Sequence, residues 1–125
     1  MNKAPTKKRS LVFFLVPNFT LLPFAGAIET LRIANRMLGY QAYEWRLAST
    51  DGQKVHSSSG IATEVNSSLA DERRFLSGEN RPSMVIVCSG VYVEEFHNKS
   101  VNAWLREAYN RGAAVGSLCT GAHVL

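Results

Sequence analysis

The chain of 125 residues lacks the features of a secreted, membrane-embedded or metal-binding protein. Its two cysteines, Cys88 and Cys119, are spaced neither as a disulfide framework nor as metal ligands. No apolar run approaches the roughly 18 residues that a transmembrane helix needs. Residues 11–16 follow basic residues as a secretory signal would, but Pro17 and Asn18 end the run too early. The sequence therefore predicts a cytoplasmic protein with no metal, no cofactor and no membrane partner.

A surplus of charge is confined to the beginning of the chain. Four of the fourteen basic residues lie within the first nine positions, and the other ten are balanced by ten acidic residues. Residues 1–10 are polar and basic and are predicted to be a disordered tail. Residues 11–125 show no basic face for phosphate contacts, so this chain is not expected to bind DNA by itself.

Short apolar segments in the remaining sequence predict a parallel sheet. Continuous apolar runs without polar alternation are typical of strands that are covered on both faces. Such runs occur at residues 11–16, 84–88 and 113–118, and residues 43–48 alternate as a further strand. Residues 54–57 and 61–65 are interpreted as a small hairpin at the margin of the sheet, whereas residues 66–83 are polar and turn-rich and carry no predicted element.

Two helices are expected between these strands. Residues 24–38 place apolar side chains at helical spacing and end at Gly39, and a second helix begins at a cap, Asn98 or Ser100, and stops at Gly112. Strands that alternate with helices predict one α/β domain, a parallel sheet with helices on both faces.

In such a sheet, ligands bind at the carboxyl ends of the strands. Three segments should meet there: residues 17–24, residues 88–92, and the pair Cys119 and Thr120. The N–H groups of Gly90, Val91 and Thr120 are candidate donors to an anion. Gly90 is explained equally well by a turn after its strand. Asn18 and Thr20 either cap the first helix or line the loop.

Cys119 is the candidate nucleophile. It follows an apolar strand and precedes small residues and an apolar helix, as in the sharp strand-to-helix turn that exposes a nucleophile. Ser117 stands two positions earlier, where the full pattern has glycine. The alternative is a small cysteine packed at the end of a strand.

A base for that thiol is hard to find in the sequence. His123 lies one helical turn after Cys119 among apolar neighbours, which favours a packing role. Nothing in the sequence brings His56 or His97 to the site. Glu29 lies in the first helix, where a solvated charge is the more ordinary explanation.

Four segments together carry a family resemblance. Residues 13–19 (FFLVPNF), 25–35 (AGAIETLRIAN), 85–90 (VIVCSG) and 118–122 (LCTGA) resemble the N-terminal domain of GlxA-type AraC-family transcriptional regulators. These domains belong to the ThiJ/PfpI, class I glutamine-amidotransferase-like superfamily. The similarity runs through nearly the whole chain from about Leu11.

The resemblance implies a flavodoxin-like three-layer sandwich with a mainly parallel sheet. It implies a homodimer that binds a small-molecule effector, such as an amino acid or a quaternary amine. DNA binding would belong to a C-terminal helix-turn-helix domain that is absent here, and residues 11–125 would be the N-terminal portion of the sensing domain, whose C-terminal part is missing from this chain.

Departures from the family pattern favour a sensor over an enzyme. Enzymes of the superfamily usually place an acid where this chain has Pro23, which cannot accept a proton, and hydrolases often carry histidine where it has Thr120. Cys119 would then be a vestigial nucleophile in the pocket wall, although a cysteine-dependent hydrolase or hydratase stays open as the alternative. The residues expected to bind the ligand are Asn18, Pro23, Phe24, Gly90, Val91, Cys119 and Thr120.

Overall fold

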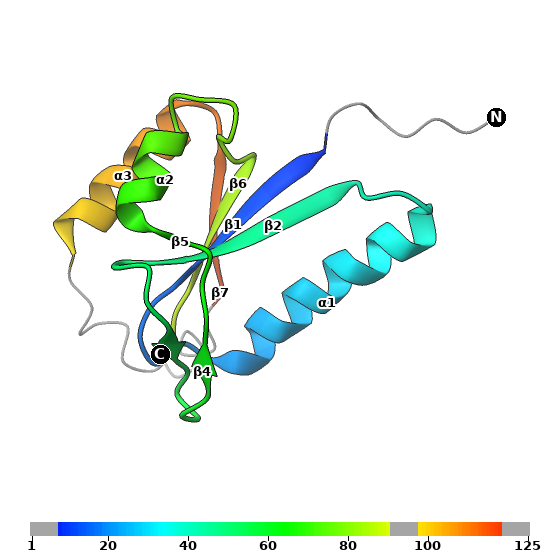
Figure 1. The fold of residues 1–125 in the computed structure, drawn as a ribbon, viewed down its shortest axis with the longest axis horizontal. Coiled ribbons are helices and arrows are strands. Elements are labelled where there is room, and N and C mark those ends of the chain that lie inside the picture. Colours follow the sequence, from blue (N-terminus) through cyan, green and yellow to red (C-terminus); the bar gives the residue numbers. More distant parts are fainter. Residues whose placement is uncertain (1–7, 91–97, 119–125) are drawn as a thin grey trace.

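The computed structural model describes residues 8–90 and 98–118 (Figure 1). The helices are α1 (Leu21–Leu38), α2 (Leu69–Phe75) and α3 (Lys99–Asn110). The strands are β1 (Arg9–Leu15), β2 (Tyr43–Ser49), β3 (Val55–His56), β4 (Ala62–Thr63), β5 (Ser67–Ser68), β6 (Met84–Cys88) and β7 (Ala114–Leu118).

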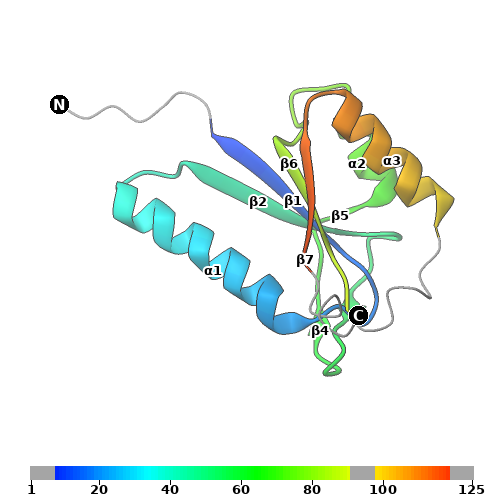
Figure 2. The same ribbon diagram turned by 180° about the vertical axis from the view of Figure 1, so that it is seen from behind.

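These elements form three layers. Five of the described strands make one sheet in the order β5-β2-β1-β6-β7, and every neighbouring pair in it is parallel. Helix α1 covers one face of the sheet, and α2 with α3 covers the other (Figures 1 and 2). The predicted flavodoxin-like sandwich is confirmed, and so is the antiparallel hairpin, which is formed by β3 and β4.

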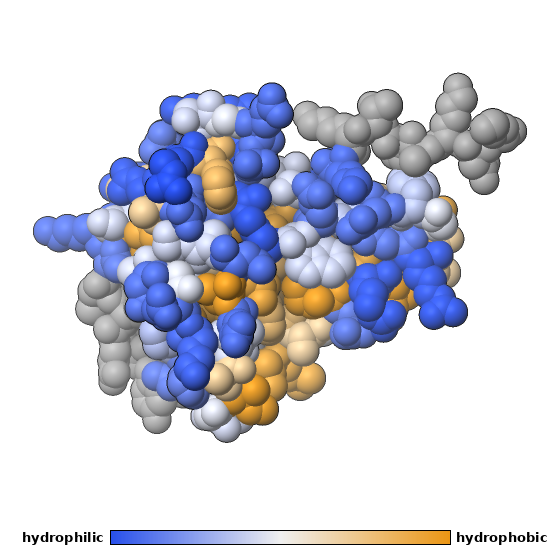
Figure 3. Space-filling model, in the orientation of Figure 1, coloured by the Kyte–Doolittle hydropathy of each residue, from blue (hydrophilic) through white to orange (hydrophobic). Residues whose placement is uncertain are grey.

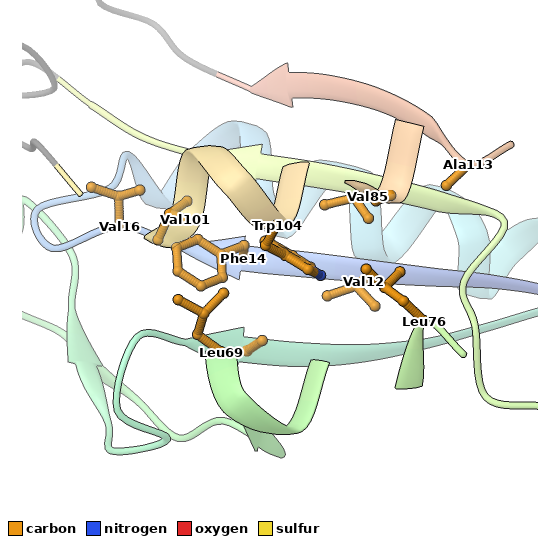
Figure 4. Close-up of a cluster of buried hydrophobic side chains, with 11 residues drawn as sticks. Val12, Phe14, Val16, Leu69, Leu76, Val85, Val101, Trp104 and Ala113 are labelled. Carbon is orange, nitrogen blue, oxygen red and sulfur yellow. The ribbon is translucent and has the colours of Figure 1, made fainter. Parts of the chain in front are cut away.

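The central strand β1 supplies both hydrophobic cores because its side chains alternate between the two faces. Val12 and Phe14 point toward α2 and α3, where Phe14 contacts Trp104 of α3 with ring centroids 5.4 Å apart (Figure 4). Phe13 and Leu15 point toward α1. All four side chains are completely buried, so β1 is covered on both faces, as its unbroken apolar sequence predicts.

Helix α1 begins three residues before the predicted start. Pro23 lies in its first turn. Proline has no backbone N–H, and this position tolerates the loss because N–H groups in the first turn have no acceptor within the helix. The helix ends at Gly39, which adopts a left-handed conformation (φ 81°) and donates its N–H to the carbonyl of Asn35 at 3.0 Å. The Asn35 side chain also bonds both backbone groups of Tyr43, at 2.9 and 3.0 Å, and so fixes the start of β2.

The prediction that residues 66–83 contain no regular element is wrong. They form β5 and α2, and α2 opens with a capping box in which Ser68 and Asp71 bond each other's backbone N–H groups. The Ser-x-x-Asp spacing at residues 68–71 is a helix-start signal, but the seven-residue helix that follows is too short to display a clear apolar period.

Helix α2 carries a buried ion pair. Glu72 is fully buried, and its two carboxylate oxygens accept from Nε and Nη2 of Arg46 on β2 at 2.6 and 2.8 Å. The Ser67 hydroxyl of β5 donates to the same carboxylate at 2.6 Å. Arg46 also donates to the Asn80 carbonyl at 3.0 Å, and its guanidinium lies 4.7 Å from the centre of the Phe75 ring. This cluster connects β2, β5, α2 and the segment that leads into β6.

Of the two predicted caps of α3, Asn98 is the one observed, because its side chain accepts a hydrogen bond from the N–H of Val101 at 3.1 Å. Gly112, which the sequence marks as the helix stop, has a left-handed conformation (φ 98°). The buried Trp104 indole N–H of α3 has no hydrogen-bond partner within the described part of the chain. No helix among residues 8–90 and 98–118 is both long and apolar enough to cross a bilayer.

Strand β7 is parallel to β6 as predicted, but it is not buried as predicted. Its first four residues are exposed, and Val115 retains 40% of its accessible surface. The reason is its position: β7 is the edge of the described sheet, where one side of a strand has no neighbour.

Replacing Glu72 by glutamine should destabilise the chain by about 3 kcal/mol, because Arg46 would keep its charge in a mostly buried position without a partner. Urea unfolding followed by circular dichroism measures the loss. Glu29→Gln is the matched control, since the Glu29–Arg32 pair is exposed and should leave the unfolding midpoint unchanged. Equal midpoints for Glu72→Gln and the parent chain would contradict a stabilising role for the cluster.

Candidate functional site

The loop between β1 and α1 is fixed from two sides at the carboxyl edge of the sheet. On one side, the Asn18 N–H donates to the His56 carbonyl at 2.9 Å, and the Ser58 N–H donates to the Phe19 carbonyl at 2.8 Å. On the other side, the Thr20 N–H donates to the Ser89 carbonyl at 3.1 Å. The loop therefore lies like a short strand between the β3–β4 hairpin and the end of β6. Asn18 takes the left-handed conformation (φ 67°), which asparagine tolerates better than most residues.

Gly90 has a packing role at this edge. A Cβ atom at this position would lie 2.3 Å from the Asn18 carbonyl oxygen and 3.0 Å from the Thr20 hydroxyl. Glycine is therefore required by the close approach of the two loops. A turn or a ligand contact, the two explanations that the sequence suggests, is not needed to account for it.

A hollow of about 320 Å³ opens between the ends of β1 and β2 and the first strand of the hairpin. Its volume lies at the lower end of the range for small-molecule pockets. The lining residues are Leu15, Pro17, Asn18, Ser49, Thr50, Asp51, Lys54, Val55 and His56.

One wall of the hollow is a rigid turn after β2. The Ser49 hydroxyl accepts from the Gly52 N–H at 3.0 Å and donates to the Gln53 carbonyl at 2.8 Å. The Asp51 carboxylate accepts from the Gln53 N–H at 3.0 Å. These bonds fix the backbone from which Lys54 and His56 extend, so the polar side chains of the wall start from defined positions.

The hollow presents groups of both charges. Lys54 forms no ion pair within the described ranges, so its ammonium is available to a carboxylate or another anion. Asp51 offers a carboxylate to a cation, Asn18 offers an amide, and Pro17 offers an exposed apolar ring. The arrangement suits a small polar molecule.

Sequence reasoning missed most of this hollow. It treated His56 as a hairpin residue with no route to the site, whereas the hairpin packs against the β1–α1 loop and places His56 beside Asn18. The position of His56 depends on tertiary contacts between distant segments. The bonds between residues 18–20 and 56–58 join backbone groups, and no residue type in the sequence announces them.

The other predicted ligand-binding residues divide into three sets. Asn18 lines the hollow, whereas Gly90 does not line it and packs against the backbone of Asn18 and Thr20. Phe24 is buried between Phe13 and Phe19, with ring centroids 5.9 and 5.5 Å away, and Pro23 is half-buried beside it in α1. Val91, Cys119 and Thr120 lie outside the described residues, as do His97 and His123, so their convergence on this edge stays a prediction.

Two further titratable residues, Glu29 and the second cysteine, Cys88, lie outside the lining of the hollow. Glu29 is exposed on α1, where a hydrogen bond from Arg32 lowers the pKa of its carboxyl group. Cys88 is buried at the end of β6, and burial raises the pKa of its thiol to about 12. In the described ranges, no three side chains of His, Cys, Asp or Glu gather as a metal site.

Comparison of the sequence with curated proteins finds transcriptional regulators. The chain is 32% identical over 119 residues to the HTH-type transcriptional regulator GbdR of Pseudomonas aeruginosa, a match that covers 94% of this chain and 30% of the regulator. It is 32% identical to the regulator CdhR of the same species and 30% identical to GlxA of Rhizobium meliloti, with 90% of this chain and 31% and 33% of those proteins covered. No family model matches the chain.

Comparison of the structure finds the same fold in longer chains. An AraC family transcriptional regulator from Pseudomonas putida superposes with a TM-score of 0.75 at 23% identity, over 91% of this chain and 57% of that one. A ThiJ/PfpI family protein from Pseudomonas syringae superposes with a TM-score of 0.62 at 17% identity, over 100% of this chain and 48% of that one. The chain thus spans about a third of its curated relatives and about half of these solved chains.

Gly90→Ala should lower the free energy of unfolding by about 2 kcal/mol, because the new methyl group would collide with the Asn18 carbonyl. Gly26→Ala is a control of opposite sign. Gly26 lies within α1 with nothing near its added Cβ, so alanine should stabilise the chain by about 0.5 to 1 kcal/mol. Chemical unfolding of both variants tests this, and a Gly90→Ala chain as stable as the parent would contradict the close approach of the loops.

Cys88 should resist alkylation in the folded chain. With a pKa of about 12, only about one thiol in ten thousand is ionised at pH 8, and the sulfur is buried as well. Iodoacetamide labelling of a Cys119→Ser chain, read by mass spectrometry, should give no product until urea unfolds it. Because the folded pKa exceeds the ordinary value of 9.0, burial of this thiol favours folding below pH 9 and loses that effect as the pH rises toward 12. Rapid labelling of the native chain at pH 8 would contradict this burial.

Proposed function

Since this chain is homologous to HTH-type transcriptional regulators of the AraC-family type and has the flavodoxin-like fold of ThiJ/PfpI proteins, we propose that it is the effector-sensing portion of such a regulator. DNA binding then belongs to a separate helix-turn-helix domain of the complete protein, and the protein works in the cytoplasm. This portion begins earlier than the sequence predicts, because Arg9 and Ser10, which the prediction assigned to the tail, belong to β1.

The hollow at the carboxyl edge is the observation that carries the proposal. Ligands of open parallel sheets bind at this edge, and the hollow has the size and mixed polarity of a small-metabolite pocket. Lys54 can hold a carboxylate while Asp51 attracts a cationic group. This pairing suits an amino acid, and the Asp51 carboxylate suits a quaternary amine as well. Effector binding here would reach the Cys119 region through Gly90 and the end of β6.

A sensor needs no nucleophile, and the described residues support that choice. Pro23 stands in the first turn of α1 at the position where related enzymes carry an acid, and a proline side chain accepts no proton. We propose that Cys119, Thr120 and Val91, which lie outside the described residues, contribute to the pocket wall.

We also propose that the protein is a homodimer. Four apolar side chains of α1 are exposed, two of them retaining about 80% of their surface, and Figure 3 shows apolar surface near the start of this helix. They are Leu22, Ile33, Met37 and Leu38. A helix with apolar residues on an outward face is suited to pack against a second copy.

The complete regulator should bind one member of a panel of free amino acids and quaternary amines, which raises its thermal midpoint. For a ligand that carries a carboxylate, Lys54→Gln should weaken the affinity about tenfold, the value expected for loss of one charge-assisted hydrogen bond. Lys99→Gln, an exposed lysine of α3, is the matched control and should change nothing. Calorimetric titration measures both variants.

Cys119→Ala should preserve effector affinity and transcriptional response in a reporter assay. Loss of the response together with measurable turnover of the ligand by the parent protein would contradict the sensor assignment. A Lys54→Gln protein with unchanged affinity for a ligand that carries a carboxylate would remove the hollow from the proposal.

A further inference from the structure

A second hollow lies at the opposite, amino-terminal edge of the sheet. It has a volume of about 420 Å³, and three arginines line it: Arg9, Arg81 and Arg111. They come from the start of β1, from the segment that leads into β6, and from the end of α3. The sequence shows no basic face, because these residues lie 30 to 102 positions apart; the fold brings them together.

The backbone around the hollow is held by hydrogen bonds between neighbouring elements. The Arg9 N–H donates to the Ala42 carbonyl at 2.9 Å, and the Ser83 N–H donates to the Ser10 carbonyl at 2.7 Å. The Ala114 N–H donates to the Ser83 carbonyl at 2.9 Å. The buried Ala113 also lines the hollow. The three arginines therefore extend from fixed positions.

Two of the three guanidinium groups are available to a ligand. Within residues 8–90 and 98–118, neither Arg9 nor Arg81 pairs with a carboxylate. Arg111 is shared, because it donates to Glu107 at 3.2 Å and to the Leu76 carbonyl at 3.4 Å. Glu79 is the acidic residue in the lining, so the lining side chains carry a net charge of two positive units.

The carboxyl end of α3 does not cancel this charge. Its negative end would disfavour an anion if its last carbonyls were open. However, the Ala108 and Tyr109 carbonyls already accept from the N–H groups of Ala113 and Gly112, both at 3.0 Å.

We propose that this hollow binds the phosphate dianion of a small molecule. A guanidinium group presents a planar fork of N–H donors that matches phosphate oxygens, and a dianion balances the charge of the lining. A concave space of this volume suits a small phosphorylated molecule, whereas the convex backbone of a nucleic acid duplex would meet the rim first. The proposal does not depend on the effector site, which lies at the other edge of the sheet.

The test uses the full chain at low ionic strength with inorganic phosphate and glycerol 3-phosphate as probes. Calorimetry should give saturable binding of both, and the amide signals of Ser83, Gly112 and Ala113 should shift in two-dimensional NMR spectra. Arg81→Gln should weaken the affinity at least tenfold. Arg36→Gln, which removes the same charge from the exposed end of α1, should leave it within twofold.

Three results would overturn the proposal. Acetate at equal concentration should displace neither probe, and equal affinity for acetate and phosphate would show that the hollow does not select phosphate. Equal weakening by Arg36→Gln and Arg81→Gln would mean a diffuse attraction. Tight binding of a 16-base-pair duplex that Arg81→Gln abolishes, without saturable binding of either small probe, would assign the surface to nucleic acid.

Discussion

The buried carboxylate of Glu72 is the constraint on which one side of the molecule depends. An ion in a protein interior is stable only when it is paired and hydrogen-bonded, and Glu72 meets this condition through Arg46 and Ser67. Those partners come from β2 and β5, so α2 can occupy one position and orientation on the sheet. With α2 in place, Leu69 and Leu76 complete the core around Trp104 and Phe14. A polar cluster thus joins α2 to two strands of the sheet beside the apolar core that α2 helps to cover.

The two edges of the sheet differ because the connections at each edge differ. At the carboxyl edge, the β1–α1 loop is bonded to the hairpin on one side and to the end of β6 on the other. This arrangement leaves a hollow with both charges beside a closely packed contact at Gly90. At the amino edge, three arginines line one hollow. They come from the start of β1, from the segment before β6 and from the end of α3. The hollow at the carboxyl edge therefore presents charges of both signs, whereas the lining of the hollow at the amino edge is mainly basic.

The sequence was informative wherever a pattern reflects local physics. Unbroken apolar runs predicted the buried central strands, and Gly39 and Asn98 marked the ends at which α1 stops and α3 begins. It failed for α2, whose seven residues are too few for a period, and for β7, whose burial depends on neighbours and not on its own residues. Asn18 was found at the candidate site because it follows β1. Lys54 and His56 were not, since their approach to Asn18 depends on backbone bonds between distant segments.

The two edge strands of the described sheet, β5 and β7, differ in their ability to pair with a further strand. Strand β5 has two residues, which is too short to template another strand. Strand β7 has five, contains no charged residue, and exposes most of its length. An uncharged, extended edge of this kind is a ready template for backbone pairing. Any further strand that joins this sheet, whether from the same polypeptide or from another copy, will therefore add beside β7, and at high concentration the isolated chain should self-associate through that edge.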